Sequence, residues 1–310
     1  MKVLITGGAG YIGTATIAAL GKLDRALEIV VYDNLSRNNR NFFIGHPFPD
    51  TLSLQFVQAD ILDTRKLSRA IDGVDVVVHL AARVTTPFAN DDPHLYEQVN
   101  HWGTAELSYI LERSPPKQVI YLSSASVYGG GDGAFSVASP PRPRTWYGTS
   151  KLRGEQMLER LLDDTQMHIL RCGNVYGYNR SMRFDAVINR FVFESLCFGR
   201  ISIHGDGDQG RAFIHIDHVA QALARLIDGT DLPSGTYDLI DRNLTINELV
   251  AALRELVPDL ETLFIEQDMP RRTLMVRPDY RLLERELFVQ RPLVDELTTL
   301  RDRFSIVRNG

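Results

Sequence analysis

The stretch "KVLITGGAGYIGTATIAAL", residues 2–20, decides the fold, because a short apolar run leads through a glycine-rich turn into a helical pattern. Gly7 permits the tight turn, Gly10 lets the backbone approach a pyrophosphate, and Gly13 lets helix and strand pack closely. The amino terminus of the helix offers N–H groups and the positive end of its dipole to an anion. The stretch therefore predicts a strand–turn–helix unit that binds a dinucleotide.

The next apolar run, "EIVVYD", ends in Asp33, twenty residues after Gly13. A carboxylate at this position accepts hydrogen bonds from a ribose diol and repels a 2′-phosphate, which favours NAD as the cofactor. Arg37 lies close enough in sequence to compensate such a phosphate, so NADP stays the less favoured alternative. The further cofactor contacts that we expect are Tyr11, Ile12, Asn34, Asp60, Ile61, Leu80, Ala81, Ala82 and Asn100.

Short apolar, β-branched runs alternate with helical patterns along the first half of the chain, as at 54–57, 74–80 and 118–124. Such continuous apolar strands between helices indicate a parallel sheet that is covered on both faces. After about residue 175 the alternation of apolar runs and helical patterns becomes irregular. We therefore predict an α/β fold, with a doubly wound parallel sheet (Rossmann) in residues 1–174. Residues 175–310 would form a smaller α/β substrate lobe that exchanges segments with the first, and the cleft would lie between them.

The composition limits which classes of molecule we expect the protein to bind. The 310 residues carry a formal net charge of -5, which argues against nucleic acid or an anionic membrane as the main partner. Two cysteines, Cys172 and Cys197, make neither a disulfide framework nor a zinc cage, so no metal is expected. The first residues lack a signal-peptide pattern, and no run approaches the roughly 20 apolar residues that span a bilayer. We expect a cytoplasmic protein.

A second motif, "TWYGTSKLRGE" at 145–155, places Tyr147 and Lys151 one helical turn apart. Tyrosine ionises near about 10 in water, and a neighbouring ammonium favours the phenolate. Ser124 ends the strand "VIYLSS" and could hydrogen-bond the same substrate oxygen. Taken alone, the pair would be a helix cap and a solvated charge. Together with the cofactor turn, the trio predicts removal of a proton from a secondary alcohol whose hydride passes to NAD.

Five segments in this order resemble the extended short-chain dehydrogenase/reductase family, in particular its nucleotide-sugar epimerases and dehydratases. They are "TGGAGYIG" at 6–13, "AD" at 59–60, "HLAA" at 79–82, "SSASVYG" at 123–129 and "YGTSKLRGE" at 147–155. The resemblance implies a Rossmann domain with a small nucleotide-sugar lobe and a tightly held cofactor. It also implies Ser124, Tyr147 and Lys151 as the catalytic trio.

The second half extends the resemblance. "LRCGNVYG" at 170–177 and "GDGDQGRAFIHIDH" at 205–218 imply that Asn174 and Arg211 contact the diphosphate of a nucleotide sugar. An arginine fork suits phosphate oxygens on chemical grounds as well. The family's later "R-P-G-D" segment is replaced by "MPRRTLMVRPD" at 269–279, in which Arg271 or Arg272 would form a second clamp. Further expected substrate contacts are Thr85, Ser126 and Arg183.

The turn after Ser124 bears on the reaction. Family members that eliminate water or carbon dioxide carry a carboxylate there, whereas this chain has Ala125, Ser126 and Val127. We therefore predict an NAD-dependent nucleotide-sugar 4-epimerase that works through a transient 4-keto sugar and acts as a homodimer. An NAD(P)H-dependent reductase of 4-keto sugars is the main alternative. A regulator that senses the dinucleotide without catalysis is a third.

Overall fold

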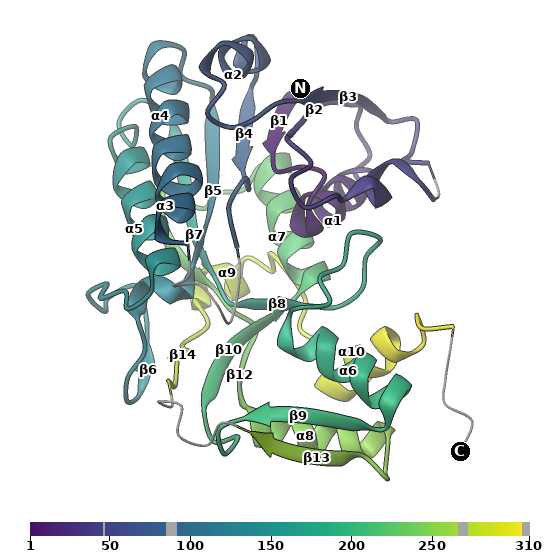
Figure 1. Ribbon diagram of the computed structural model, residues 1–310. Coiled ribbons are helices and arrows are strands. Elements are labelled where there is room, and N and C mark those ends of the chain that lie inside the picture. The colour runs from purple at the N-terminus through teal and green to yellow at the C-terminus, as the bar shows by residue number, and fades with distance from the viewer. Residues whose placement is uncertain (46, 85–91, 266–271, 306–310) are drawn as a thin grey trace.

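The computed structural model describes residues 1–45, 47–84, 92–265 and 272–305, which form two lobes (Figure 1). The larger lobe is built on a seven-stranded sheet with the order β11-β7-β5-β4-β1-β2-β3, and every neighbouring pair is parallel. Its strands are β1 (Lys2–Thr6), β2 (Leu27–Asp33), β3 (Leu52–Gln58), β4 (Val76–His79), β5 (Gln118–Ser124), β7 (Gln166–Cys172) and β11 (Gly235–Leu239).

Helices cover both faces of this sheet (Figure 1). On one face, α1 (Tyr11–Leu20) packs beside α7 (Ile216–Asp228). On the other face lie α2 (Thr64–Ile71), α4 (Gly103–Arg113) and α5 (Trp146–Glu159). Strands between two helical layers are buried on both sides, which explains their continuous apolar sequences. The predicted doubly wound α/β fold is confirmed.

The outermost strand of the sheet comes from far along the chain. β11 pairs with β7, and α7 packs on α1, although both elements follow residue 174. The chain therefore returns to the larger lobe after it has begun the smaller one. The division at residue 174 stays a prediction, and we propose that the segment from α7 to β11 belongs to the Rossmann lobe.

The smaller lobe combines short strands with three helices around its own core. Strand β10 (Gly210–His215) pairs with β8 (Asn174–Tyr176) and β12 (Arg242–Thr245), while β9 (Arg200–His204) pairs with β13 (Glu261–Ile265). The helices are α6 (Val187–Phe198), α8 (Ile246–Leu256) and α10 (Leu293–Arg301). Among the described residues, no helix is both long and apolar enough to cross a membrane.

Short elements complete the structure. They are η1 (Arg40–Phe43), α3 (Pro93–Tyr96), η2 (Glu97–Trp102), η3 (Ala125–Tyr128), β6 (Ala134–Phe135), β14 (Met275–Val276) and α9 (Tyr280–Glu284). The strands β6 and β14 pair with each other. The glycine- and proline-rich segment 129–145 therefore contains one strand of a small two-stranded sheet.

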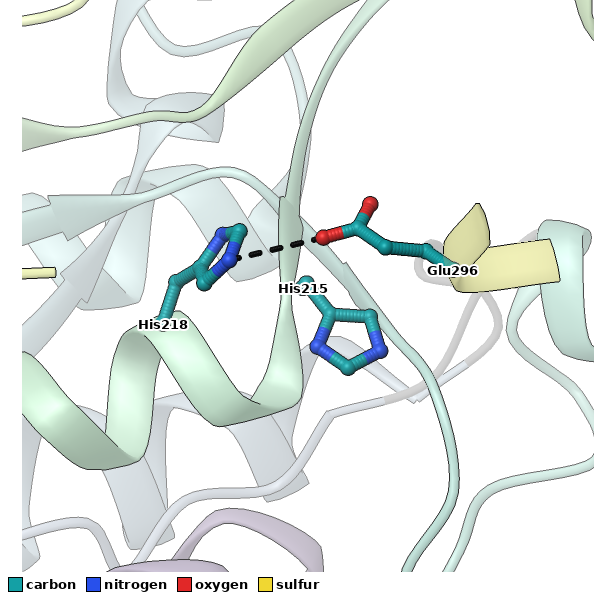
Figure 2. A group of neighbouring side chains, drawn as sticks. All are labelled: His215, His218 and Glu296. Atoms are coloured by element: carbon teal, nitrogen blue, oxygen red, sulfur yellow. Dashed lines mark ion pairs between the residues drawn. The ribbon is translucent and has the colours of Figure 1, made fainter. Parts of the chain in front are cut away.

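A buried charged cluster joins the two lobes where α7 meets α10 (Figure 2). His218 lies between two carboxylates, with Nδ1 2.9 Å from Asp241 Oδ2 and Nε2 3.4 Å from Glu296 Oε1. Arg242 contacts both of these carboxylates, at 3.1 and 3.0 Å. His215, at the end of β10, completes the group.

The ligand atoms of His215, His218 and Glu296 lie within 4.8 Å of one another, which is close enough to hold a metal ion. Arg291 nevertheless brings Nε to 3.9 Å from Glu296 Oε1, and its Nη2 lies 3.4 Å from His215 Nδ1. Positive side chains therefore already supply the charge that a cation would bring. We interpret the cluster as an ion-pair network that joins the lobes.

A single carboxyl connects β11 with the turn after β5. Tyr128 Oη donates a hydrogen bond to Asp238 Oδ1 at 2.7 Å, and Asp238 is 1% exposed. Burial raises the pKa of Asp238 to about 6, although the hydrogen bond from Tyr128 opposes this shift. The neighbouring hydrogen-bond donors therefore offset only part of the free-energy cost of burying the charged carboxylate.

This pKa predicts a pH-dependent stability. The folded carboxyl, with its pKa of about 6, binds a proton more tightly than the unfolded one at about 3.9, so its contribution is full below pH about 4 and is lost as pH rises through about 6. As the pH rises from about 4 to about 8, the original protein should lose about 2 kcal/mol of unfolding free energy relative to Asp238→Asn, which lacks the titrating carboxyl. Denaturant unfolding at several pH values measures this difference. The exposed Asp259→Asn is the control, and equal curves for all three proteins would contradict the prediction.

Candidate active site

One large cleft opens between the lobes at the carboxyl ends of the parallel strands, with a volume of about 1240 Å³. Most residues expected to bind or react line it. From the cofactor set these are Gly7, Gly10, Tyr11, Ile12, Gly13, Asp33, Asn34, Ile61, Leu80, Ala81 and Ala82. From the catalytic and substrate sets these are Ser124, Ser126, Tyr147, Lys151, Asn174, Arg183, Arg211 and Arg272.

Three expected residues are not placed at the cleft. Asp60 is exposed, and its carboxylate accepts hydrogen bonds from the Asn34 side chain and the Leu62 N–H. Asp63, rather than Asp60, caps α2. Asn100 is buried behind the cleft, where it hydrogen-bonds the backbone of Arg83 and the Ser150 hydroxyl. Thr85 lies outside the described residues.

The glycine turn forms a cradle that side chains would fill. Gly7 has φ +70°, and a Cβ there would lie 2.7 Å from the backbone nitrogen of Ala81. A Cβ on Gly13 would lie 2.5 Å from Gly8 Cα, so α1 packs directly on the turn. Gly10 is the N-cap of α1 and makes no side-chain cap, and the residues of the first turn line the cleft. This geometry fits a pyrophosphate at the amino terminus of α1.

Asp33 stands at the end of β2 beside this turn. Its carboxylate accepts hydrogen bonds from the N–H of Ala9 at 3.1 Å and of Leu35 at 2.8 Å. Burial nevertheless raises its pKa. Arg37 donates a hydrogen bond from Nη2 to the carbonyl of Val84. The expected compensation of a 2′-phosphate by Arg37 therefore competes with an existing backbone contact, and the residues present fit NAD.

Tyr147 and Ser124 meet at the bottom of the cleft. Tyr147 lies in the first turn of α5, whose N-cap Thr145 accepts a hydrogen bond from Gly148 N at 3.0 Å. Ser124 ends β5 and hydrogen-bonds the Tyr147 side chain. Burial raises the pKa of Tyr147, whereas the Ser124 hydrogen bond and the charge of Arg183 lower it. The contribution of Arg183 was not foreseen from the sequence.

Lys151 follows one turn later on the same helix and is 2% exposed. Its Nζ lies 4.1 Å from the centroid of the Tyr121 ring, which is a cation–π contact. Burial lowers the pKa of Lys151 to about 7, and the charge of Glu155 opposes this shift. The charge of Lys151 near neutral pH is therefore sensitive to modest changes in its surroundings.

Basic residues line the opposite wall of the cleft. Burial and the charge of Arg272 both lower the pKa of Arg211, whose Nη1 donates to the carbonyl of Gly210. Arg183 pairs with Asp185 through Nε at 3.0 Å and Nη2 at 2.5 Å. Two neighbouring cations, Arg211 and Arg272, suit a ligand with a strongly negative group.

Sequence reasoning overlooked several residues of the site. Tyr96 packs edge-on against Tyr147 with 6.1 Å between the ring centroids. Cys172, at the end of β7, lines the cleft and lies close enough to affect the pKa of Tyr147 and of Lys151. Its place at a strand end beside "GNVYG" was a usable signal, because strand ends of a parallel sheet meet at one edge.

Comparisons with known proteins agree with this geometry. A UDP-glucose 4-epimerase from Mycolicibacterium smegmatis is 29% identical over 73% of this chain and 72% of its own length. A dTDP-D-glucose 4,6-dehydratase from Mus musculus is 27% identical over 83% of this chain and 73% of its own length. Among solved structures, UDP-glucuronic acid 4-epimerase from Bacillus cereus in complex with UDP-glucuronic acid and NAD is similar, with a TM-score of 0.84. It is 25% identical, over 97% of this chain and 98% of that one.

One family model covers most of the chain. It is described as the NAD dependent epimerase/dehydratase family, and it matches residues 3–238, which include the glycine turn, Ser124, Tyr147, Lys151 and Arg211. The relatives and the solved structures are nucleotide-sugar enzymes of the same kind. The chain therefore belongs to the NAD-dependent epimerase/dehydratase family of nucleotide-sugar enzymes.

Proposed function

We propose that the protein is an NAD-dependent nucleotide-sugar 4-epimerase that works through a transient 4-keto sugar. The observation that carries this proposal is the convergence of Ser124, Tyr147 and Lys151 in one cleft, beside a turn that carries no carboxylate. In that turn Ala125 and Val127 are buried, and neither carries an acid or a base. Elimination of water or carbon dioxide needs such a group, so hydride removal and return are the steps that this site supports.

Each residue of the trio has a distinct part. Tyr147 takes the proton of the C4 hydroxyl, and Ser124 holds both the Tyr147 side chain and the substrate oxygen. Lys151 supplies positive charge on the same helix face. The glycine turn and Asp33 would hold NAD tightly, and the bound cofactor would supply reversible hydride transfer. The cleft of about 1240 Å³ leaves room for the sugar to present its other face.

Arg211, Arg272 and Asn174 are proposed to bind the diphosphate of the substrate. All three line the cleft, and the mutual repulsion of the two arginines is relieved by an anion between them. The relatives' names include both UDP-glucose and UDP-glucuronic acid as bound or converted sugars. We therefore choose these two nucleotide sugars as test substrates.

The first prediction concerns Tyr147→Phe. Removal of the hydroxyl leaves the ring in place and takes away the proton acceptor, so kcat should fall by about a hundredfold or more. Binding of NAD should be unchanged within about threefold. Chromatographic separation of the two C4 epimers of each test sugar measures kcat.

Tyr109→Phe on the exposed face of α4 is the matched control and should keep full activity. Equal kcat values for Tyr147→Phe and the original protein would contradict the proposed chemistry. That result would instead favour a protein that senses the dinucleotide without catalysis.

A second prediction concerns the choice of cofactor. Asp33→Asn removes the charge that holds a ribose diol and repels a 2′-phosphate, so NAD affinity should fall by about tenfold to a hundredfold. NADP affinity should rise at the same time. Calorimetric titration of cofactor-free protein measures both constants, with the exposed Asp50→Asn as control. Stronger binding of NADP than of NAD by the original protein would contradict the assignment.

We further propose that two copies associate through the exposed face of α4 and its neighbour α5. Trp102 and Tyr109 lie seven residues apart, on one face, and are 58% and 43% exposed. Trp146, at the start of α5, is 45% exposed. Large exposed aromatic side chains gathered on adjacent helices indicate an interface, and a two-fold dimer is the commonest closed assembly.

Introduction of charge at this face tests the dimer. The variant Trp102→Glu with Tyr109→Glu should sediment as a monomer, because two carboxylates would be buried without partners. Phe264→Glu, on the exposed side of β13, is the control and should sediment like the original protein. Sedimentation of the unsubstituted chain as a monomer at micromolar concentration would refute the interface.

A further inference from the structure

Glu155 is a buried carboxylate with no role in the chemistry described above. It follows Lys151 by one turn of α5, so the two side chains share a face of the helix. Glu155 is 0% exposed and Lys151 is 2% exposed. A buried charge is costly unless it is paired and hydrogen-bonded. The surroundings of Glu155 therefore need an explanation.

Two neighbouring strands hold this carboxylate. Arg171, on β7, donates from Nη2 to Glu155 Oε2 at 2.7 Å and from Nε to Oε1 at 3.1 Å. Ser123, next to Ser124 on β5, donates its hydroxyl to Oε1. A bidentate guanidinium together with a hydroxyl fixes the orientation of the carboxylate. The same contacts fix the turn of α5 that lies between Glu155 and Lys151.

Arg171 is also linked to a second carboxylate through the hydroxyl of Tyr128. Its Nη1 donates to Tyr128 Oη at 3.1 Å, and Tyr128 in turn donates to Asp238 at 2.7 Å. Arg171, Glu155 and Asp238 therefore form a buried network next to Lys151, which lines the cleft. The charge of Glu155 acts on Lys151 as well as on Arg171 and raises the pKa of both groups.

We propose that Glu155 is a positioning residue for Lys151: clamped by Arg171 and Ser123, it fixes the lysine against β5 and keeps it an ammonium ion. The inference rests on the proposed function, in which that charge favours ionised Tyr147. Under this proposal, the buried pair of Glu155 and Arg171 contributes to the chemistry as well as to packing.

The other groups that face Lys151 do not replace this anion. Burial and the charge of Lys151 lower the pKa of His79, on β4, to about 3, and burial raises the pKa of Cys172, on β7, to about 12. Both are therefore neutral near pH 7. The phenols of Tyr121, on β5, and of Tyr147 have raised pKa values. Among these described groups, Glu155 is the carboxylate that pairs with Arg171, and its charge raises the pKa of Lys151.

Glu155→Gln tests this directly, because the amide has the same shape and no charge. The pKa of Lys151 should fall by about one unit or more. NMR of protein labelled at lysine 13Cε measures it, since the chain has only five lysines, and Lys151→Arg identifies the signal. Glu159→Gln, exposed and one turn further along α5, is the matched control and should leave that pKa unchanged.

A second readout separates this role from a purely structural one. In Glu155→Gln, the alkaline fall of kcat should move to lower pH by the same shift as the Lys151 titration. A structural role alone would lower the melting temperature and scale kcat equally at every pH. Unchanged Lys151 titration in a folded Glu155→Gln protein would overturn the proposal.

A third variant keeps the test decisive. If Glu155→Gln does not fold, Glu155→Gln with Arg171→Met removes both charges of the pair, which is often tolerated. The pKa of Lys151 should still lie below its original value, and an equal or higher value overturns the proposal. The NMR titration needs no turnover, so absence of epimerase activity would refute the proposed function and leave this inference separately tested.

Discussion

The site depends on how closely α5 packs against β5 and the turn that follows it. A Cβ on Gly148 would lie 2.5 Å from the carbonyl oxygen of Ser126, and one on Gly154 would lie 2.4 Å from Tyr121 Oη. A larger residue at either position would push the helix outward. The two glycines therefore let the helix bring Tyr147 to Ser124 and lay Lys151 over Tyr121.

Charges buried in pairs accompany this packing. Beneath the cleft, Glu155 and Arg171 join α5 to the sheet, and between the lobes His218 joins α7 to α10 through Glu296. Such pairs add little net stability compared with apolar residues of the same shape, but the loss of one partner is costly. Their physical effect is to allow one arrangement of the elements around the cleft. Both networks occur where segments distant in sequence meet.

Much of the fold and of the site could be predicted from local spacing. The glycine turn, Asp33 and the pair Tyr147 and Lys151 are each determined by a few consecutive residues, and the structure brings them to one cleft. Contacts between distant segments could not be predicted in the same way. The Asp60 carboxylate accepts a hydrogen bond from the Asn34 side chain, and β11, which follows residue 174 in the chain, joins the sheet. No periodicity in the sequence encodes which strand end meets which side chain.

The reaction itself is tested most directly by incubating the purified protein with UDP-glucose and with UDP-glucuronic acid, without added cofactor, and following the sugar signals by proton NMR. The account predicts that at least one of these sugars is converted into a mixture with its C4 epimer over many turnovers, with no other product. A 4-keto-6-deoxy sugar, a pentose with release of carbon dioxide, or turnover only with added reduced cofactor would contradict it.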